Sequence, residues 1–230
     1  MDQLWARVTA TSPPLTTPWL VGTALVALVL VAQRDLWRVS RNAVTIAHEG
    51  AHGVAALVTG RRLAGIRLHS DTSGVTVSAG RPSGPGMVAT AFAGYPGPAL
   101  FGLGAAALLA AGHAIGVLWV LLALLALLLL QIRNFYGLWS VLVTGGLVFA
   151  ATWWLPGQWQ AAFAHVVVWF LLLAAPRAVW ELQAQRRRRP TPDSDADQLA
   201  RLTGVPGLVW VGVFLALSLG SLALAVRWLT

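Results

Sequence analysis

The sequence predicts an all-α polytopic membrane protein with about six to seven transmembrane helices and a short β-hairpin. The first observation is composition, because 57% of the 230 residues are hydrophobic and only 10% are charged, far from the balance of a soluble globule. The second is that apolar runs of about 18 or more residues recur along the chain, each able to cross a hydrocarbon core of roughly 30 Å as a helix. The third is an alternation of apolar and polar residues, which predicts the hairpin.

Seven hydrophobic segments account for the predicted helices. The hairpin is expected between the second and third segments, where Ile66, Leu68, Val75 and Val77 alternate with polar residues around a turn. We expect a single membrane domain over residues 1–230, with a solvated cytoplasmic loop over 183–205 that is rich in arginine, proline and aspartate. The seven segments cover about 18–33, 40–59, 87–111, 114–131, 136–154, 160–180 and 206–228.

The arginines predict how the protein lies in the cell membrane. Assigning successive loops to alternate sides gives a bias of about three to one in favour of a cytoplasmic N-terminus. An odd number of spans would then leave the C-terminus outside. The inside set is Arg7, Arg61, Arg62, Arg67, Arg81, Arg133, Arg177, Arg186 to Arg189 and Arg201, and the outside set is Arg34, Arg38, Arg41 and Arg227.

Charge and cysteine content restrict the partners and the chemistry. The net charge of +8 comes from arginines that flank apolar segments, so we expect contacts with the lipid bilayer and its anionic headgroups, and no nucleic-acid partner. The chain has no cysteine, which excludes disulfides, thiolate catalysis and cysteine-ligated zinc. Any metal ion must therefore be held by histidine and carboxylate.

An HExxH motif lies within the second predicted helix, at His48, Glu49 and His52. A separation of four residues places both imidazoles on one helix face, where they can share one zinc ion. In this motif the glutamate acts as general base on the zinc-bound water, whose pKa falls to about 7. Since the chain has five His and two Glu, a chance match has a frequency of roughly one in a thousand. The alternative is a polar contact between helices without a metal.

The motif, the hairpin after it and the turn from Ala93 to Pro98 together resemble the site-2 protease family of intramembrane zinc metalloproteases, in particular its small bacterial branch without a PDZ domain. The resemblance covers the order of elements over most of the chain. It implies a zinc metalloprotease in which His48 and His52 bind the metal and Glu49 is catalytic.

The chain departs from the family pattern at the third zinc ligand. Members of the family usually supply an aspartate from a later helix, but the nearest counterpart here, around Asn134, contains no Asp. The run from Ser194 to Asp197 resembles a Ser-Asp-Ala element of a divergent branch, which implies Asp195 as the third ligand, with Asp197 as runner-up and Asn134 as a further alternative. The same run is also typical of a helix N-cap, and Asp193 is expected to have no role in metal binding.

The resemblance implies an endopeptidase that cleaves a transmembrane segment of another membrane protein. The hairpin can pair with the substrate as an added strand. One rival is a catalytically inactive membrane scaffold or chaperone that retains the metal site, and another is a transporter with a zinc-binding histidine pair, for which inverted repeats are not found. The other histidines, His69, His113 and His165, are expected to have structural or interfacial roles.

Overall fold

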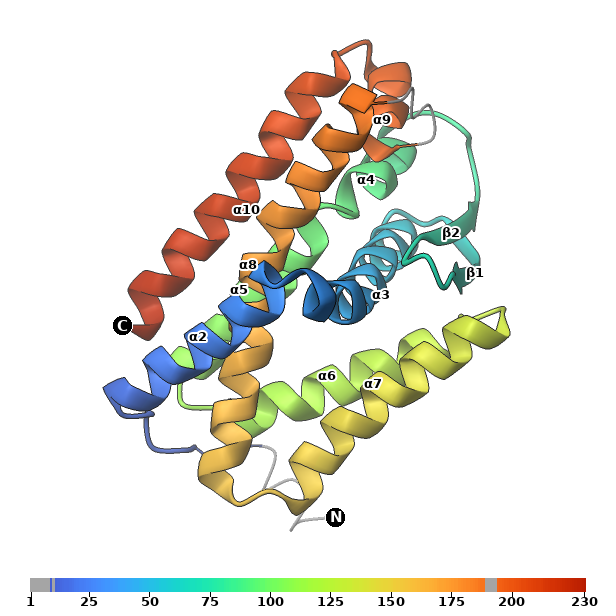
Figure 1. Cartoon of the computed structure of the whole chain (residues 1–230). Coiled ribbons are helices and arrows are strands. Elements are labelled where there is room, and N and C mark those ends of the chain that lie inside the picture. The colour runs from blue at the N-terminus through green and yellow to red at the C-terminus, as the bar shows by residue number, and fades with distance from the viewer. Residues whose placement is uncertain (1–8, 10, 189–193) are drawn as a thin grey trace.

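The computed structural model describes residue 9, residues 11–188 and residues 194–230. Arg7, Arg189 and Asp193 lie outside these residues. The architecture confirms an all-α polytopic membrane protein with one antiparallel hairpin (Figure 1). The helices are α2 (Thr17–Ala32), α3 (Arg34–Val58), α4 (Pro85–Ala93), α5 (Pro96–Ala110), α6 (Ala114–Leu129), α7 (Phe135–Trp154), α8 (Gly157–Arg188), α9 (Asp195–Thr203) and α10 (Gly207–Leu229), and the strands are β1 (Arg62–Leu68) and β2 (Gly74–Ala79).

Fewer helices qualify as membrane spans than the six to seven expected. Within the described residues, α7, α8 and α10 are long and apolar enough to cross a membrane. The pair α2 and α3 is bent by 99° and the pair α4 and α5 by 72°, so the total reaches five if each pair is one broken span. Helix α6 is apolar but has only 16 residues, fewer than the ~20 that cross a bilayer core. The expected number of spans was too high because hydropathy detects the length of an apolar run and not the angle between two consecutive helices.

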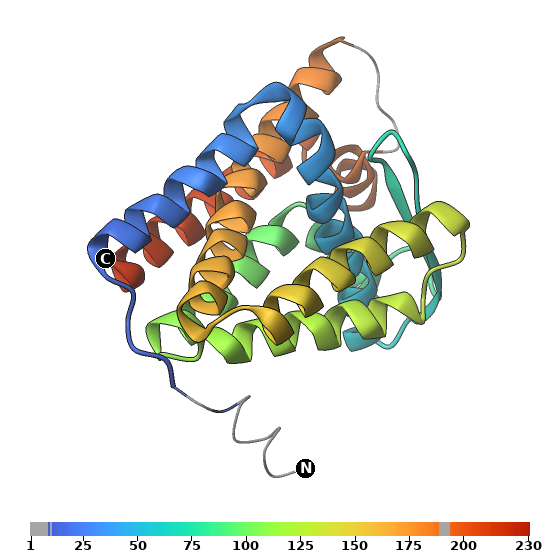
Figure 2. The ribbon, with the colours of Figure 1, turned by 60° about the horizontal axis from the view of Figure 1, so that its bottom comes forward.

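Helix α8, with 32 residues, is the centre of the fold. It packs against α2, α5, α6 and α10 around a core that includes Trp37, Leu118, Val168 and Leu172. Helices α6 and α7 form an antiparallel pair beside this bundle (Figures 1 and 2). Helix α3 turns away from α2 toward the hairpin, so that its middle part is enclosed by α4, α5 and the strands. The motif at 48–52 therefore lies inside the molecule.

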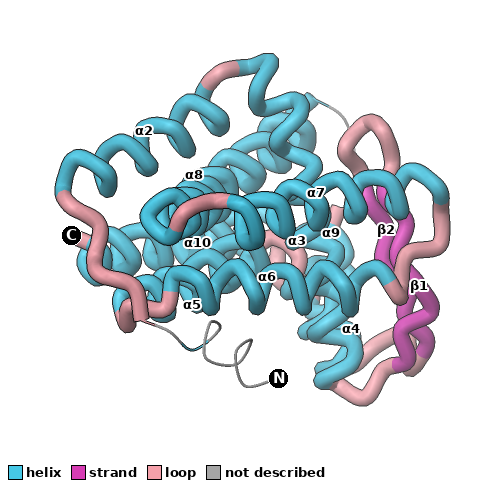
Figure 3. Tube along the Cα trace, turned by 90° about the horizontal axis from the view of Figure 1, so that it is seen from below, coloured by secondary structure: helices cyan, strands magenta, loops and turns pink. Residues whose placement is uncertain are grey.

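The positions of the chain ends and of two arginines correct the expected topology. The C-terminus lies beside the start of α2 in all three views (Figures 1, 2 and 3), so both described ends are at the same end of the bundle, not at opposite ends as an odd number of spans implied. Arg41 and Arg177, assigned to opposite sides, lie 3.5 and 3.4 Å from the same carboxylate, Glu181. The alternation failed because α3 does not return across the bundle after α2. The side on which the N-terminus lies stays a prediction.

The predicted hairpin is present, and its two edges differ. Leu68 pairs with Gly74 and Ile66 with Thr76 in an antiparallel register. The outer edge of β1 is occupied by the segment before α7, since the Ile66 N–H donates to Gln131 O at 2.8 Å and the Asn134 side chain bonds both the carbonyl and the N–H of Leu68, at 2.6 and 3.2 Å. Within the described residues the sheet has only these two strands, so the outer edge of β2 has no strand partner.

The parts of segment 183–205 that the structure describes, residues 183–188 and 194–205, are mostly helical, where a solvated loop was expected. Helix α8 continues to Arg188, and α9 begins at Asp195. Ser194 caps α9 by accepting a hydrogen bond from the Asp197 N–H, and Gly204 ends it at a φ of 75°. Buried Leu199 and Leu182 pack with Phe214 of α10 in a second apolar cluster. This burial anchors a segment whose charged residues suggested a loop.

The hydrogen bonds of Asn134 generate a prediction about stability. Asn134→Ala leaves the outer-edge N–H and carbonyl of a fully buried residue, Leu68, without their partner, at a cost of about 1–3 kcal/mol. We expect a lower midpoint of thermal unfolding in detergent micelles, whereas Ser83→Ala, at an exposed position, should leave it unchanged. Equal midpoints for the two variants would show that this link between the hairpin and α7 contributes nothing.

Candidate metal centre

Helix α3 brings the two motif histidines together as the spacing predicts. Their Nε2 atoms lie 3.1 Å apart. The Nδ1 atom of His52 lies 2.6 Å from the carbonyl oxygen of Thr90 in α4. A carbonyl can only accept, so Nδ1 carries the proton, and in the neutral imidazole the Nε2 lone pair is directed toward His48. Thr90 thus has the role that outer hydrogen-bond partners have at zinc sites, where they fix the orientation of a histidine ligand.

Asp195 completes a group of three metal-binding side chains with the histidines. Its Oδ2 atom lies 3.3 Å from His48 Nε2 and 3.3 Å from His52 Nε2. In the described part of the chain this is the one group of three or more His, Cys, Asp and Glu residues with the spacing to hold a metal ion. Asp195 stands in the first turn of α9, which contacts α4 and α10.

The geometry of this group fits a zinc ion. Ligands at about 2.0–2.1 Å in a tetrahedral zinc site are separated from one another by about 3.3 Å. The three separations of 3.1, 3.3 and 3.3 Å are close to that value. The Oδ2 atom of Asp195 is buried and accepts no hydrogen bond within the described residues. An oxygen without a donor that faces two nitrogen lone pairs is stabilised by a cation placed between them.

The electrostatics of Asp195 also favour a cation. Burial alone would raise the pKa of its carboxyl, but positive charge on the His52 and His48 side chains, as in their protonated forms, outweighs burial and holds that pKa well below its usual range. The carboxylate is therefore ionised. Two imidazoles and one carboxylate form the donor set that suits zinc in catalytic sites, where three protein ligands leave a fourth position open.

The alternatives for the third ligand lie elsewhere. Asp197 forms an ion pair with Arg186, at 2.6 Å between Oδ1 and Nη2, and its Oδ2 accepts from the Ser194 hydroxyl at 2.6 Å. Asn134 is bonded to β1, as described above. Asp193 lies outside the described residues. The N-cap alternative is correct for Ser194, and it coexists with the placement of Asp195 beside the histidines because the two residues have separate roles.

The turn from Ala93 to Pro98 borders the metal centre. A Cβ atom on Gly94 would lie 2.6 Å from Asp195 Oδ2 and 2.6 Å from His48 Cε1, and closer still to His52 Nε2, so only glycine fits beside the three side chains. The ring of the next residue, Tyr95, meets the His48 imidazole edge to face with 4.8 Å between centroids, and stacks on Phe214 at 5.4 Å. The turn thus packs α5 and α10 against the centre.

Glu49 is held by the hairpin. It is 4% exposed, and its Oε2 atom accepts a hydrogen bond of 2.6 Å from the hydroxyl of Thr76 in β2. A Cβ on Gly74 would lie 2.6 Å from Oε1 of the same carboxylate, so the start of β2 lies directly against it. Glu49 is not a member of the three-residue metal group, in agreement with a role other than ligation. Sequence reasoning missed Thr76, Gly74 and Thr90, since nothing in their spacing relates them to the motif.

The remaining histidines lie outside the metal group. His69 is at the hairpin turn, with its Nδ1 atom 3.4 Å from Ser73 Oγ. His113 directly precedes α6. His165 is buried in α8, where its Nδ1 lies 2.7 Å from the Ala161 carbonyl oxygen. Their positions agree with the structural readings.

The family described as Peptidase M50B-like matches residues 21–225. The chain belongs to this family. The resemblance to site-2 proteases is thereby confirmed, and with it membership of a family of membrane metallopeptidases. No curated protein and no solved structure matches the chain.

The two aspartates of α9 provide a test of the ligand set. Asp195→Ala should lower zinc affinity by more than the 10–100-fold loss typical of outer-shell changes, because it removes a direct ligand. Asp197→Ala removes the Arg186 pair and part of the cap, and should cost about 1 kcal/mol of stability with far less effect on the metal. Zinc titration of both proteins, with His48→Ala as the reference for a lost ligand, distinguishes them. Equal affinities for the two variants would contradict the assignment.

Gly94→Ala is expected to abolish metal binding while every ligand is retained. The added methyl would occupy the space between the three side chains and force them apart. Gly104→Ala in α5 is the matched control, because a Cβ there meets nothing within 4 Å. The measurement is zinc per chain in the purified proteins. A Gly94→Ala protein that holds as much zinc as wild type would show that the turn does not border the metal.

Proposed function

We propose that the protein is an intramembrane zinc metalloendopeptidase that cleaves a transmembrane segment of another membrane protein. The observation that carries the proposal is the convergence of His48, His52 and Asp195 on one point, with Glu49 next to it in the same helix. Family membership supports the class of chemistry. The helices that are long and apolar enough to cross a membrane support a membrane-embedded substrate.

Three residues of the chain would bind the metal ion, and a fourth would transfer the proton. His48, His52 and Asp195 hold the metal. Zinc, when bound there, supplies Lewis-acid polarisation and a water that ionises near neutral pH. Glu49 takes the proton from the attacking water and delivers it to the leaving amine, as general base and then general acid. Thr76 donates to Glu49 Oε2 at 2.6 Å, which leaves Oε1 available for the proton.

The hairpin supports a specific mode of substrate binding. A helical substrate shields its peptide bonds with its own hydrogen bonds, so the segment to be cut must first become extended. The outer edge of β2 is unpaired within the described residues and can accept such a segment as an added strand. Thr76 belongs to this strand and touches the general base, so a peptide paired along β2 passes beside Glu49. The opposite edge is unavailable, since the segment before α7 occupies it.

Glu49→Gln tests the proposal. It keeps the size of the side chain and its acceptor for Thr76 but removes the base, so cleavage should fall by at least the 10²–10⁴-fold typical of general acid–base catalysis. Zinc content and the amount of folded protein should stay at wild-type levels. Substrates can be identified by comparing the membrane proteomes of cells with the wild-type and the Glu49→Gln protein.

Three outcomes of this comparison differ in meaning. Loss of cleavage with zinc retained supports the peptidase. Cleavage that persists in Glu49→Gln would place the chemistry elsewhere. A wild-type protein that binds zinc but leaves every membrane protein intact would favour the inactive scaffold or chaperone.

A further inference from the structure

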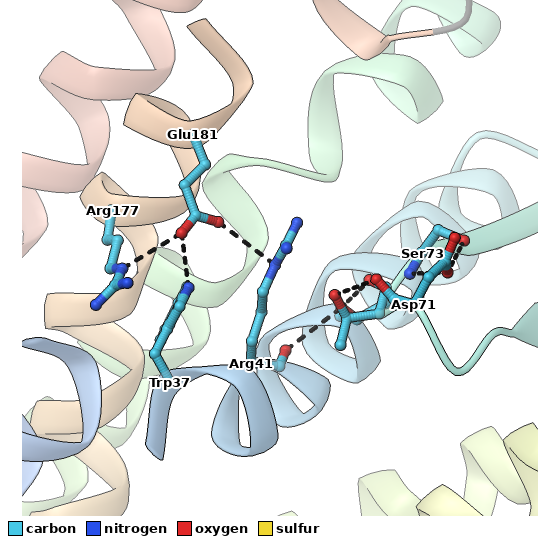
Figure 4. Close-up of polar contacts among 8 residues, drawn as sticks. Trp37, Arg41, Asp71, Ser73, Arg177 and Glu181 are labelled. Carbon is cyan, nitrogen blue, oxygen red and sulfur yellow. Dashed lines mark hydrogen bonds and ion pairs between the residues drawn. The ribbon is translucent and has the colours of Figure 1, made fainter. Parts of the chain in front are cut away.

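Two adjoining clefts lie where α2 ends and α8 reaches its polar end, and their walls include none of His48, His52 and Asp195. They have volumes of about 480 and 440 Å³ and share Arg41, Arg177 and Glu181 in their walls. Glu181 accepts a hydrogen bond of 2.7 Å from the indole of Trp37, and the Arg177 guanidinium stacks over that indole at 4.4 Å (Figure 4). The guanidinium of Arg41 lies beside the same carboxylate, at 3.5 Å. The first cleft is also lined by Trp180, Ala184, Gln185 and Arg188, and the second by Arg34, Arg38 and the hairpin turn from Ser70 to Thr72.

The clefts contain more positive than negative charge. Five arginines line them, against two carboxylates, Glu181 and Asp71. Hydrogen bonds from Ser73 hold the pKa of Asp71 below its usual range. The arginines in the cleft walls outnumber the carboxylates by three. Within the described residues no carboxylate pairs with Arg34 or Arg188, and both are exposed. The clefts therefore have free guanidinium groups for an anion, and guanidinium is the group best suited to bidentate contact with phosphate.

The surroundings of the clefts are apolar on one side. Helix α2 exposes Val21, Leu25 and Val29 over its length, each about half accessible, and this face leads to Arg34 at the start of α3. Trp180, 71% exposed, stands in the wall of the first cleft. Tryptophan is enriched at the level of lipid headgroups. Arginines at the end of an exposed apolar helix, with a tryptophan beside them, match a phospholipid, with the phosphate in the cleft and the acyl chains along α2.

We propose that these clefts bind the phosphate of an anionic phospholipid. The phosphate lies against Arg41 and Arg177, which are already ordered by Glu181 and Trp37, and Arg34 and Arg188 close around the headgroup. The proposal does not depend on peptidase activity, because none of these arginines belongs to the metal centre.

The test uses the full-length protein in neutral detergent and measures binding of phosphatidylglycerol by native mass spectrometry and by titration. Wild type should bind the lipid saturably and in preference to phosphatidylcholine. Arg34→Gln/Arg188→Gln should raise the dissociation constant by at least tenfold. The matched control is Arg62→Gln/Arg67→Gln, which removes two exposed arginines of β1 and should leave the constant within twofold of wild type. All of these side chains are exposed, so folding is preserved, as unfolding midpoints will show.

Three results would overturn the proposal. An equal loss of affinity for phosphatidylglycerol in the cleft and control variants would mean that binding depends only on the overall charge of the protein. Inorganic phosphate that displaces the lipid at an equal concentration would show that the clefts take free phosphate and do not recognise a lipid. A soluble acidic peptide that displaces the lipid at a lower concentration than phosphatidylglycerol itself would make the clefts a peptide site.

Discussion

Two imidazoles and a carboxylate enclosed among apolar helices are unfavourable unless each polar atom has a partner. This constraint explains much of the fold around the metal centre. The His52 Nδ1 atom meets the Thr90 carbonyl, and the Nε2 atoms and Asp195 Oδ2 face one another at 3.1–3.3 Å. To hold Asp195 there, α9 must be fixed in place at both faces. The ion pair between Asp197 and Arg186 ties it to α8, while buried Leu199 packs it against α10.

The turn that contains Gly94 and the strand that begins at Gly74 can lie close to helix α3 because both residues are glycine. Gly94 lies against the metal ligands, and Gly74 lies against the Glu49 carboxylate. A side chain at either position would collide with His48, His52 and Asp195 or with Glu49. Helix α3 can therefore be surrounded by a turn on one side and a strand on the other, with Glu49 and His52 buried between them. Both glycines belong to elements that arrive from later in the chain, so the centre is complete only when the whole fold has formed.

Local sequence patterns identified the residues of the centre that lie close together in the chain. They did not identify the residues that distant segments contribute. His48, Glu49 and His52 were found because a spacing of four residues places side chains on one helix face, whatever surrounds it. The hairpin followed from period-two alternation. Asp195 came only from a family resemblance, because a contact across 147 residues leaves no trace in local periodicity, and Thr76 and Thr90 were missed for the same reason. The 99° bend after α2 was also invisible, and it invalidated the assignment of Arg41 and Arg177 to opposite sides.

That bend also determines where the candidate metal centre lies in the bundle. If α3 continued along α2, His48 would lie far from the arginine-rich end of α8. Because α3 turns by 99° away from α2, it does not follow α2 back along the bundle, and His48 is only two turns, about 10 Å, along the helix from Arg41. Asp195 likewise follows the polar end of α8 by a few residues. The group of His48, His52 and Asp195 is therefore buried among side chains but close to the polar end of the bundle.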